Sequence, residues 1–209
     1  MNPRLVLLRH GNTFSAGEKV VMVGATQDLP LTEKGIAQAQ AVGESLRSIA
    51  PSVVKLLVGP LKRTVQYAEQ VKQSGAIEVE PVIDQRLIEL NYGAWGGLSN
   101  EEIERLSGAE TLKNWQQQGM RPAGIQFAPS EDQLRAETES VLAECALIKG
   151  TVVVVTSNGR LREYARLIGG EAYSGAKVKT GHSCLVELSE GRWKILGWDM
   201  SPDDVIGVL

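Results

Sequence analysis

Four consecutive valines, Val152–Val155, limit what this chain can fold into more than any other feature of the sequence. β-Branched side chains favour an extended backbone, and a strand without polar alternation has to be covered on both faces. Such a strand belongs in the interior of a sheet that carries helices on both sides. We therefore predict that Thr151–Thr156 is a central strand of an α/β fold.

Shorter apolar runs alternate with amphipathic segments along the rest of the chain, which is typical of a layered α/β fold. The other expected strands are Arg4–Leu8, Lys55–Gly59 and a terminal hairpin of Val178–Leu188 and Trp193–Trp198. Helices are expected from Thr32 to about Ser48, from Pro60, from Ser99, over Thr111–Gln118 and Glu131–Lys149, and from Gly159 to Ile168. These segments predict a three-layer α/β/α sandwich with a mainly parallel central sheet, in which residues 1–209 form one domain.

Composition and charge exclude several classes of protein. The net charge of -3 argues against a sequence-independent nucleic-acid binder, which needs a basic surface. No apolar run reaches the ~20 residues that cross a bilayer, and the N-terminus lacks the features of a signal peptide. We therefore expect a cytoplasmic protein without nucleic-acid or membrane partners. Cys145 and Cys184 lack metal-ligand spacing, so we predict two reduced, buried thiols and no metal site.

Three of the predicted strands end in residues suited to phosphate chemistry. Arg9–Gly11 follow the first strand, Gly59–Arg63 follow the second, and Ser157–Gly159 follow the valine-rich strand. The carboxyl ends of parallel strands meet at one edge of an open sheet, where the ligand site lies. An imidazole such as that of His10 can attack a phosphoryl group, and an adjacent guanidinium can bind it. We expect these three segments to form one site.

Four segments of the chain resemble the histidine phosphatase superfamily, which includes the phosphoglycerate mutases. They are LLRHGNT at Leu7–Thr13, DLPLTEKGIAQAQ at Asp28–Gln40, GPLKRTVQYAE at Gly59–Glu69 and LIELNYGAWGGLS at Leu87–Ser99. Their order along the chain is that of the superfamily. The resemblance implies a phosphoglycerate mutase-like fold and a reaction through a phosphohistidine, with no metal and no cofactor.

By this resemblance His10 is the nucleophile, and its imidazole would hold the transferred group as a phosphohistidine. Arg9 and Arg63 carry planar guanidinium groups that suit bidentate phosphate contacts. Asn12 and Thr13 would add neutral donors beside nearby backbone amides. Two structural interpretations remain open: His10 as a hydrogen-bonded side chain at a strand end, and Arg63 as a solvated charge in the first turn of a helix.

Glu89 is the candidate general acid. It lies in the apolar segment LIELNYGAW, where burial would raise the pKa of its carboxyl group and keep a proton available for the leaving group. The deprotonated carboxylate would then activate the water that releases the phosphate. The alternative is a structural carboxylate that pairs with an arginine such as Arg86.

The sequence departs from the superfamily pattern after the valine-rich strand. There the superfamily has His-Gly-Gly, and its second histidine stabilises charge on the phosphoryl group, whereas this chain has Ser157, Asn158 and Gly159. Ser157 and Asn158 would act as neutral donors to the phosphate. The missing positive charge corresponds to a loss of ~2 to 4 kcal/mol of transition-state stabilisation, or roughly a hundredfold to a thousandfold in rate.

Three groups of side chains could compensate for the missing histidine. Asn158 could turn its amide toward the phosphate, which is the favoured interpretation, or Arg160 or Arg162 could supply charge from the following helix. His182, in the segment KTGHSC, could reach the pocket from the start of the last long strand. A plain surface histidine is the alternative for His182.

The sequence therefore predicts a metal-independent phosphomonoester hydrolase whose activity is reduced by Ser157. Its substrate would be a small phosphorylated metabolite or another phosphomonoester. A catalytically silent phosphate-binding regulator is the alternative. A phosphoglycerate mutase is a weaker third hypothesis, because mutases must retain the phosphohistidine and usually carry extra segments.

Substrate choice would depend on the loops Ser15–Gln27 and Ser107–Glu131. In the second loop Trp115, Met120 and Phe127 either line an organic group or pack the loop to the core, and packing is the favoured interpretation. The apolar end of the chain, residues 205–209, could contact a second copy of the chain in a homo-oligomer.

Overall fold

A six-stranded sheet lies at the centre of the part of the chain that the computed structural model describes, residues 2–170, 173 and 175–208. In the order β3-β2-β4-β1-β5-β6, its strands are β3 (Pro81–Ile83), β2 (Val53–Val58), β4 (Thr151–Thr156), β1 (Arg4–Arg9), β5 (Ser183–Ser189) and β6 (Arg192–Met200). The pairs β1–β4, β2–β4 and β2–β3 are parallel, whereas β5 is antiparallel to both β1 and β6. The predicted α/β fold with a mainly parallel sheet is confirmed.

The valine-rich strand β4 lies between β1 and β2, as predicted. Val153 pairs with Val6 of β1 on one side and with Leu56 of β2 on the other, and all six residues of β4 are buried. Alternate residues of a strand face opposite sides of the sheet. Val153 therefore contributes to one hydrophobic core, whereas its neighbours Val152 and Val154 contribute to the other.

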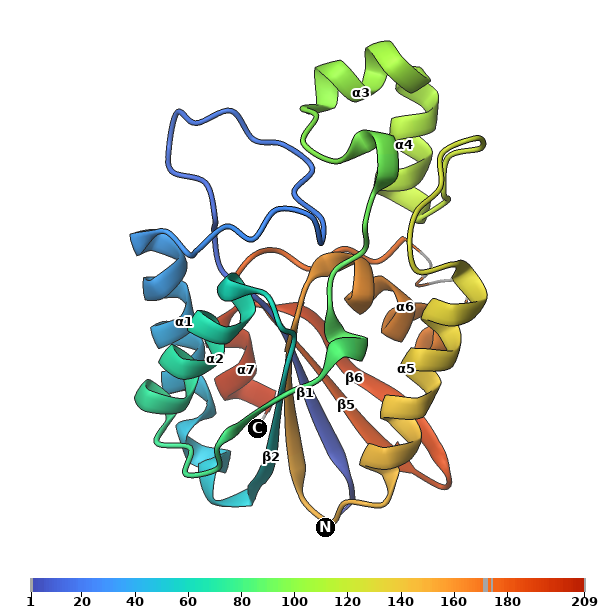
Figure 1. Cartoon of the computed structure of the whole chain (residues 1–209). Coiled ribbons are helices and arrows are strands. Elements are labelled where there is room, and N and C mark those ends of the chain that lie inside the picture. The colour runs from blue at the N-terminus through green and yellow to red at the C-terminus, as the bar shows by residue number, and fades with distance from the viewer. Residues whose placement is uncertain (1, 171–172, 174, 209) are drawn as a thin grey trace.

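Helices cover both faces of this sheet, which gives the three layers that the sequence predicts (Figure 1). One face carries α1 (Glu33–Leu46), α2 (Lys62–Gly75) and α7 (Pro202–Val208), and the other carries α5 (Glu131–Ala146) and α6 (Asn158–Gly169). Thr32 is the N-cap of α1, as predicted, and its side chain accepts a hydrogen bond from the Gly35 amide. Short 3₁₀ helices form at Arg47–Ser52, Gln85–Leu87 and Gly93–Trp95.

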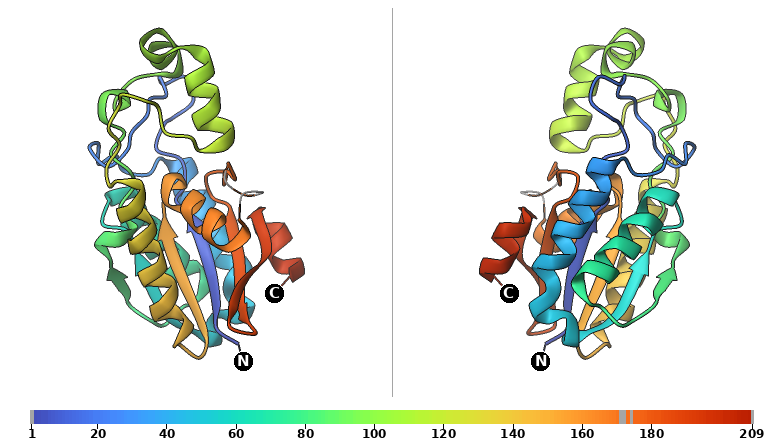
Figure 2. Two further views of the ribbon diagram at one scale, coloured as in Figure 1. Left: turned by 90° about the vertical axis from the view of Figure 1, so that its right-hand side faces the viewer. Right: turned by 90° about the vertical axis from the view of Figure 1, so that its left-hand side faces the viewer.

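Two further helices, α3 (Asn100–Ser107) and α4 (Ala109–Gln118), stand above the carboxyl ends of the strands (Figures 1 and 2). We call residues 100–129 the cap. The predicted capping box of Ser99 and Glu102 starts α3. Trp115 and Phe127 are buried in a separate aromatic cluster of the cap, as the packing interpretation expects, whereas Met120 is 55% exposed. Leu90, Tyr92 and Leu134, outside the cap, belong to the same cluster, so this cluster joins the cap to the edge where the candidate site lies.

The last third of the chain differs from the predicted elements. The hairpin begins at Ser183 rather than Val178. The backbone of Val178 bonds to the side chains of Arg9 and Asn158 instead of to a neighbouring strand. The sequence pattern did not predict β3 and α7, which are too short to show a period. In α7, Val205 is buried while Ile206 is exposed, and Leu209 lies outside the described residues.

The two cysteines are free and buried, as predicted. Burial raises the pKa of the Cys145 thiol to about 11 and that of Cys184 to about 12, so both thiols are protonated near neutral pH. None of the helices within residues 2–170 and 175–208 combines the length and the apolar character needed to cross a membrane.

Candidate active site

The carboxyl ends of β1, β2 and β4 meet at one edge of the sheet, and hydrogen bonds join the segments that follow them. The His10 amide donates to the Thr156 carbonyl over 3.1 Å, and the Gly59 amide donates to the Val155 carbonyl over 2.9 Å. Gly11 lies so close to α1 that a β-carbon there would be 2.5 Å from the Gly35 carbonyl oxygen. The three predicted segments therefore lie together, as expected.

His10 is buried, with 7% of its surface exposed. Its Nδ1 lies 2.8 Å from the Gly11 carbonyl oxygen, and its Nε2 lies 3.1 Å from the Nε of Arg63. A carbonyl can only accept and a guanidinium can only donate, so Nδ1 carries the proton and Nε2 carries the lone pair. Burial, and then the charges of Arg63 and Arg9, hold the pKa of His10 well below its ordinary value. The imidazole is therefore neutral near neutral pH, the state that a nucleophile requires.

Arg63 belongs to the first turn of α2 and is almost fully buried, so the interpretation as a solvated charge is wrong. Besides its bond to His10, it donates from Nη1 to the Gln27 carbonyl over 3.0 Å and from Nη2 to the Gly24 carbonyl over 2.8 Å. Burial lowers the pKa of its guanidinium. Arg63 thus connects the candidate nucleophile to the loop that follows β1.

Arg9, the last residue of β1, donates from Nη1 to the Val178 carbonyl, and its Nε has no hydrogen-bond partner among the described residues. Burial lowers the pKa of Arg9, while the charge of Glu89 raises it. Lys177 lies near enough that the positive charge of Arg9 helps to lower its pKa, after the effect of burial. This cluster of cations would attract an anion.

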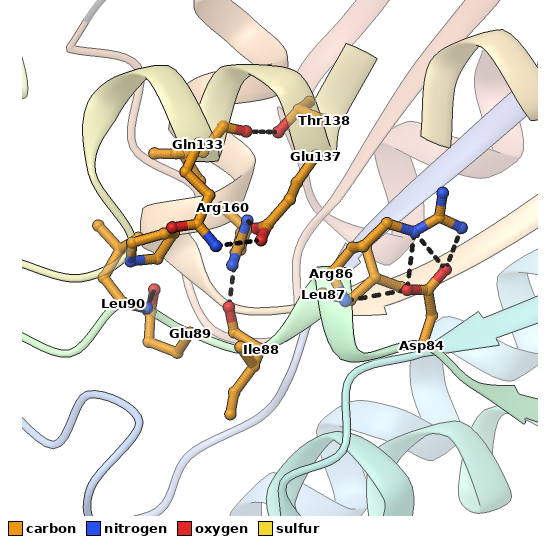
Figure 3. A network of polar contacts seen from close by, with 12 residues as sticks. Asp84, Arg86, Leu87, Ile88, Glu89, Leu90, Gln133, Glu137, Thr138 and Arg160 are labelled. Carbon is orange, nitrogen blue, oxygen red and sulfur yellow. Dashed lines mark hydrogen bonds and ion pairs between the residues drawn. The ribbon is translucent and has the colours of Figure 1, made fainter. Parts of the chain in front are cut away.

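Glu89 is 6% exposed and accepts two backbone hydrogen bonds. Oε1 accepts from the Leu90 amide over 2.8 Å, and Oε2 accepts from the Gly159 amide over 3.2 Å. The alternative pairing with Arg86 is wrong, because Arg86 binds Asp84 and Glu144 instead (Figure 3 shows Arg86 with Asp84). The carboxylate is held beside the start of α6, next to the other strand ends.

Ser157 is the N-cap of α6 and Asn158 is its first residue. Ser157 is fully buried, and its Oγ has no hydrogen-bond partner among the described residues. Asn158 turns its Oδ1 to the Val178 amide, which donates over 2.9 Å. Val178 therefore lies between Asn158 and Arg9, and its backbone bonds to both side chains.

Comparisons with known proteins decide the family. The sequence profile of the histidine phosphatase superfamily (branch 1) matches residues 5–201. The chain belongs to the histidine phosphatase superfamily. Its relatives in this superfamily include the probable phosphoglycerate mutase GpmB of Salmonella choleraesuis, which is 27% identical over 203 residues, or 93% of this chain and 89% of that protein.

Solved structures share the fold. A mycobacterial glucosyl-3-phosphoglycerate phosphatase has a TM-score of 0.78 at 22% identity, covering 95% of this chain and 99% of that one. A protein described as mycobacterial hydrolase 1 has a TM-score of 0.80 at 22% identity, covering 96% of this chain and 100% of that one. The alpha-ribazole phosphatase of Shigella flexneri has a TM-score of 0.69 at 23% identity, covering 94% and 96% of the two chains.

In this member of the histidine phosphatase superfamily, the arginines of α6 bond to groups other than His10. Arg160 donates to the Ile88 carbonyl and to Glu137, each over 2.6 Å (Figure 3). Arg162 donates to the carbonyls of Trp115 and Gln116 in the cap. Arg160 therefore joins α6 to α5, and Arg162 joins α6 to the cap.

His182 lies beside the strand end but turns its ring elsewhere. Its carbonyl accepts from the Arg9 amide over 3.1 Å, whereas its Nδ1 lies 2.9 Å from the Asp199 carbonyl oxygen and 3.1 Å from Asp199 Oδ1. Asn12 also bonds locally, because its Oδ1 accepts from Thr180 Oγ1 over 2.5 Å. Thr13 is half-buried in the loop that begins there.

Two features of the site were not predicted from the sequence. The first is the position of Lys177 near Arg9, which no local motif indicates. The second is the role of Val178, which depends on its backbone rather than on its side chain. Within residues 2–170, 173 and 175–208, no group of three or more His, Cys, Asp and Glu side chains is arranged to hold a metal ion.

Proposed function

We propose that this chain is a metal-independent phosphomonoester hydrolase that works through a phosphohistidine at His10. The observation that carries the proposal is the buried, neutral imidazole whose Nε2 lone pair faces Arg63. The Glu89 carboxyl group lies at the same sheet edge. Membership in the histidine phosphatase superfamily and the phosphatases among its structural relatives support the same reaction.

In the first step Nε2 of His10 attacks phosphorus in line, and the bond from phosphorus to the ester oxygen breaks. The electron pair goes to that oxygen, which takes a proton from the Glu89 carboxyl group. In the second step the Glu89 carboxylate takes a proton from water, and the water oxygen attacks phosphorus. The bond to His10 then breaks, which releases inorganic phosphate and restores the imidazole.

Arg9 and Arg63 would bind the phosphoryl oxygens and offset the charge that accumulates in the transition state. Arg63 Nε would move its hydrogen bond from His10 to the arriving phosphoryl group. Asn12 and Thr13 would add neutral donors. Ser157 and Asn158 would contribute no positive charge, so we propose that activity is reduced by roughly a hundredfold to a thousandfold relative to a site with a second histidine.

The second candidate is a catalytically silent protein that binds a phosphorylated ligand. Two observations favour this candidate. The Asn158 side chain accepts a hydrogen bond from the Val178 amide, and Ser157 has no charge and no hydrogen-bond partner among the described residues. A phosphoglycerate mutase is a weaker candidate, which rests on the name of the Salmonella relative. A mutase would move the phosphoryl group between two positions of one molecule, whereas a phosphatase releases inorganic phosphate.

Hydrolysis of p-nitrophenyl phosphate in the presence of a metal chelator tests the proposal. The protein should release p-nitrophenol, and His10→Ala should abolish this release while keeping the thermal melting profile. Rapid quenching in alkali should trap a phosphoryl label on the protein, because phosphohistidine survives alkali and decomposes in acid. If the protein is inert but binds inorganic phosphate in a calorimeter, the silent alternative is correct.

A further inference from the structure

Asp199, in the outermost strand β6, has a backbone conformation that residues other than glycine rarely adopt (Figure 1 shows β6). Among the residues that the structure describes, three other than glycine have a positive φ, namely Ala76, Glu190 and Asp199. Ala76 is the C-cap of α2, and Glu190 lies in the turn between β5 and β6. Asp199 lies within a strand, with a φ of 55°.

This conformation coincides with a β-bulge. Ser183 of β5 pairs with Met200, but Leu185, two residues later, pairs with Gly197, so β6 carries one extra residue over this stretch. Such a residue bends the strand and changes the direction of the side chains beside it. A fold that retains an unfavourable backbone conformation often does so at a functional position. The contacts of the Asp199 side chain show what the bulge positions.

The Asp199 side chain holds residues 178–182, a segment that we call the strap. Its Oδ1 accepts from the Lys179 amide over 2.6 Å and lies 3.1 Å from Nδ1 of His182. The same Nδ1 lies 2.9 Å from the Asp199 carbonyl oxygen, which can only accept, so Nδ1 carries the proton. The strap is therefore attached to β6 through both the side chain and the backbone of one residue.

The strap in turn holds Arg9. The Val178 carbonyl accepts from Nη1 of Arg9, and the His182 carbonyl accepts from the Arg9 amide over 3.1 Å. The Val178 amide donates to Asn158 Oδ1 over 2.9 Å. The buried Nε of Arg9 has no hydrogen-bond partner among the described residues, so it is available to a phosphoryl oxygen. The direction of the Arg9 guanidinium thus depends on where the strap lies.

Gln38 of α1 holds the same strap at a second point. Its Nε2 donates to the Thr180 carbonyl over 3.0 Å, and its Oε1 accepts from the Asn12 amide over 2.9 Å. Thr180 Oγ1 also donates to Asn12 Oδ1 over 2.5 Å. Loss of the Asp199 contacts should therefore shift the strap rather than release it.

We infer that Asp199 is a positioning residue, which sets the direction of the Arg9 guanidinium through the strap. Its own carboxylate is an anion and would repel a phosphate, so it does not act as a ligand. It holds the Val178 carbonyl where that carbonyl binds Nη1 of Arg9 and leaves Nε to the phosphoryl group. This inference rests on the part of the proposed function in which Arg9 binds the phosphoryl oxygens.

Two substitutions separate positioning from charge. Asp199→Asn removes the charge but keeps an oxygen that can accept from the Lys179 amide, and asparagine tolerates a positive φ. Asp199→Gly removes both the charge and the acceptor, and glycine adopts this φ without strain. Calorimetry with inorganic phosphate should show an affinity that falls on the order of tenfold in Asp199→Gly and does not fall in Asp199→Asn. Equal phosphate affinities in the two variants overturn the inference.

Glu190→Gly is the matched control for the backbone. Glu190 has a φ of 54°, so the substitution removes the same unfavourable conformation, but its side chain is exposed in the turn between β5 and β6. The phosphate affinity of this variant should equal that of the unaltered protein. A loss as large as that in Asp199→Gly would show that backbone strain, and not the strap, controls the site.

A double-mutant cycle tests whether Asp199 acts through Arg9. Arg9→Met should weaken phosphate binding, and adding Asp199→Gly to it should then change the affinity by less than about twofold, because no guanidinium is left to be positioned. Losses that multiply would show that Asp199 acts elsewhere and would overturn the inference. Each variant is checked by thermal melting. Arg9→Lys, which keeps a charge, replaces Arg9→Met if that variant does not fold or binds too weakly to be measured.

Hydrolysis of p-nitrophenyl phosphate is measured separately, so the inference and the proposed function can fail independently. If the variants show the expected phosphate affinities while the unaltered protein hydrolyses nothing, the inference stands and the proposed hydrolysis fails. If the unaltered protein hydrolyses the ester but Asp199→Gly changes neither the phosphate affinity nor kcat/KM, the proposed function stands and the inference is wrong. A protein that binds no inorganic phosphate also contradicts the inference, because Arg9 then has no phosphoryl group to bind.

Discussion

Substituting Gly159 with alanine should separate proton donation by Glu89 from nucleophilic attack by His10, the two steps that we propose for the site. A β-carbon at residue 159 would overlap Glu89 Oε1 and lie 2.9 Å from Leu90 Cγ, whereas ordinary contact begins at 3.4 Å. Glu89 must therefore retreat by about 1 Å, and its 3.2 Å bond from the Gly159 amide is lost or weakened. A displacement of about 1 Å in a catalytic group can reduce a rate on the order of a hundredfold.

The loss should depend on the leaving group. An alkoxide needs a proton in the transition state, whereas p-nitrophenolate is weakly basic and leaves without one. We expect Gly159→Ala to lower kcat/KM for ethyl phosphate on the order of a hundredfold and that for p-nitrophenyl phosphate at most severalfold. Because kcat/KM is unaffected by steps after the phosphohistidine forms, the second role of Glu89 does not enter the comparison.

The free energy of unfolding should fall moderately in this variant. Overpacking costs about 1 to 3 kcal/mol, and the better helix propensity of alanine offsets up to about 1 kcal/mol, so the unfolding free energy falls by at most about 2 to 3 kcal/mol. Gly207→Ala in α7 is the matched control, because a β-carbon there meets nothing within 4 Å. Equal losses on both esters, or unchanged hydrolysis of ethyl phosphate, would refute the role of Glu89 as the acid.

Three further results are expected. Ser157→His should raise kcat for p-nitrophenyl phosphate by roughly a hundredfold to a thousandfold. Ser157→Ala should not raise it, because alanine removes a neutral donor to the phosphate and adds no charge; equal rates in both variants contradict the reasoning. The depressed pKa of His10 means that the unfolded chain binds the extra proton first as pH falls below 6.5, so the unfolding free energy should decrease by up to about 1.4 kcal/mol per pH unit between 6.5 and the lowered value. Urea titrations over this range should show the slope in the unaltered protein and not in His10→Asn. Arg160→Met should lower the unfolding free energy by about 1 to 3 kcal/mol, because it removes the donor to the partly buried Ile88 carbonyl, whereas the 24% exposed Glu137 keeps its bond from Gln133. Glu137→Gln should cost less, and a urea midpoint unchanged by Arg160→Met would show that this bridge is unimportant.

The central features of the fold could be predicted because they are local in the sequence. Four adjacent valines require cover on two faces, and this alone places β4 inside the sheet. That His10, Arg9, Arg63 and Glu89 lie at one edge of the sheet followed from strand ends and from motifs that each lie within a short segment. These features do not depend on which distant residues the chain brings together.

The features that sequence missed depend on contacts between distant segments. Arg86 has Asp84 two residues away, but its second partner, Glu144, belongs to α5. Asn158 was expected to turn toward the phosphate, and it instead accepts from Val178, twenty residues later. A side chain with several possible partners chooses among them only when the tertiary fold is known.

The contacts of Arg63 also bear on how this chain can change its substrate over evolutionary time. A guanidinium has five N–H groups, and Arg63 uses three of them, on His10 and on the carbonyls of Gly24 and Gln27. Arg63 therefore holds the loop after β1 by hydrogen bonds to the backbone of that loop. Side chains such as that of Gln27 can be exchanged without releasing this attachment, so new contacts to a ligand can be acquired in the loop while the chemical groups stay where they are.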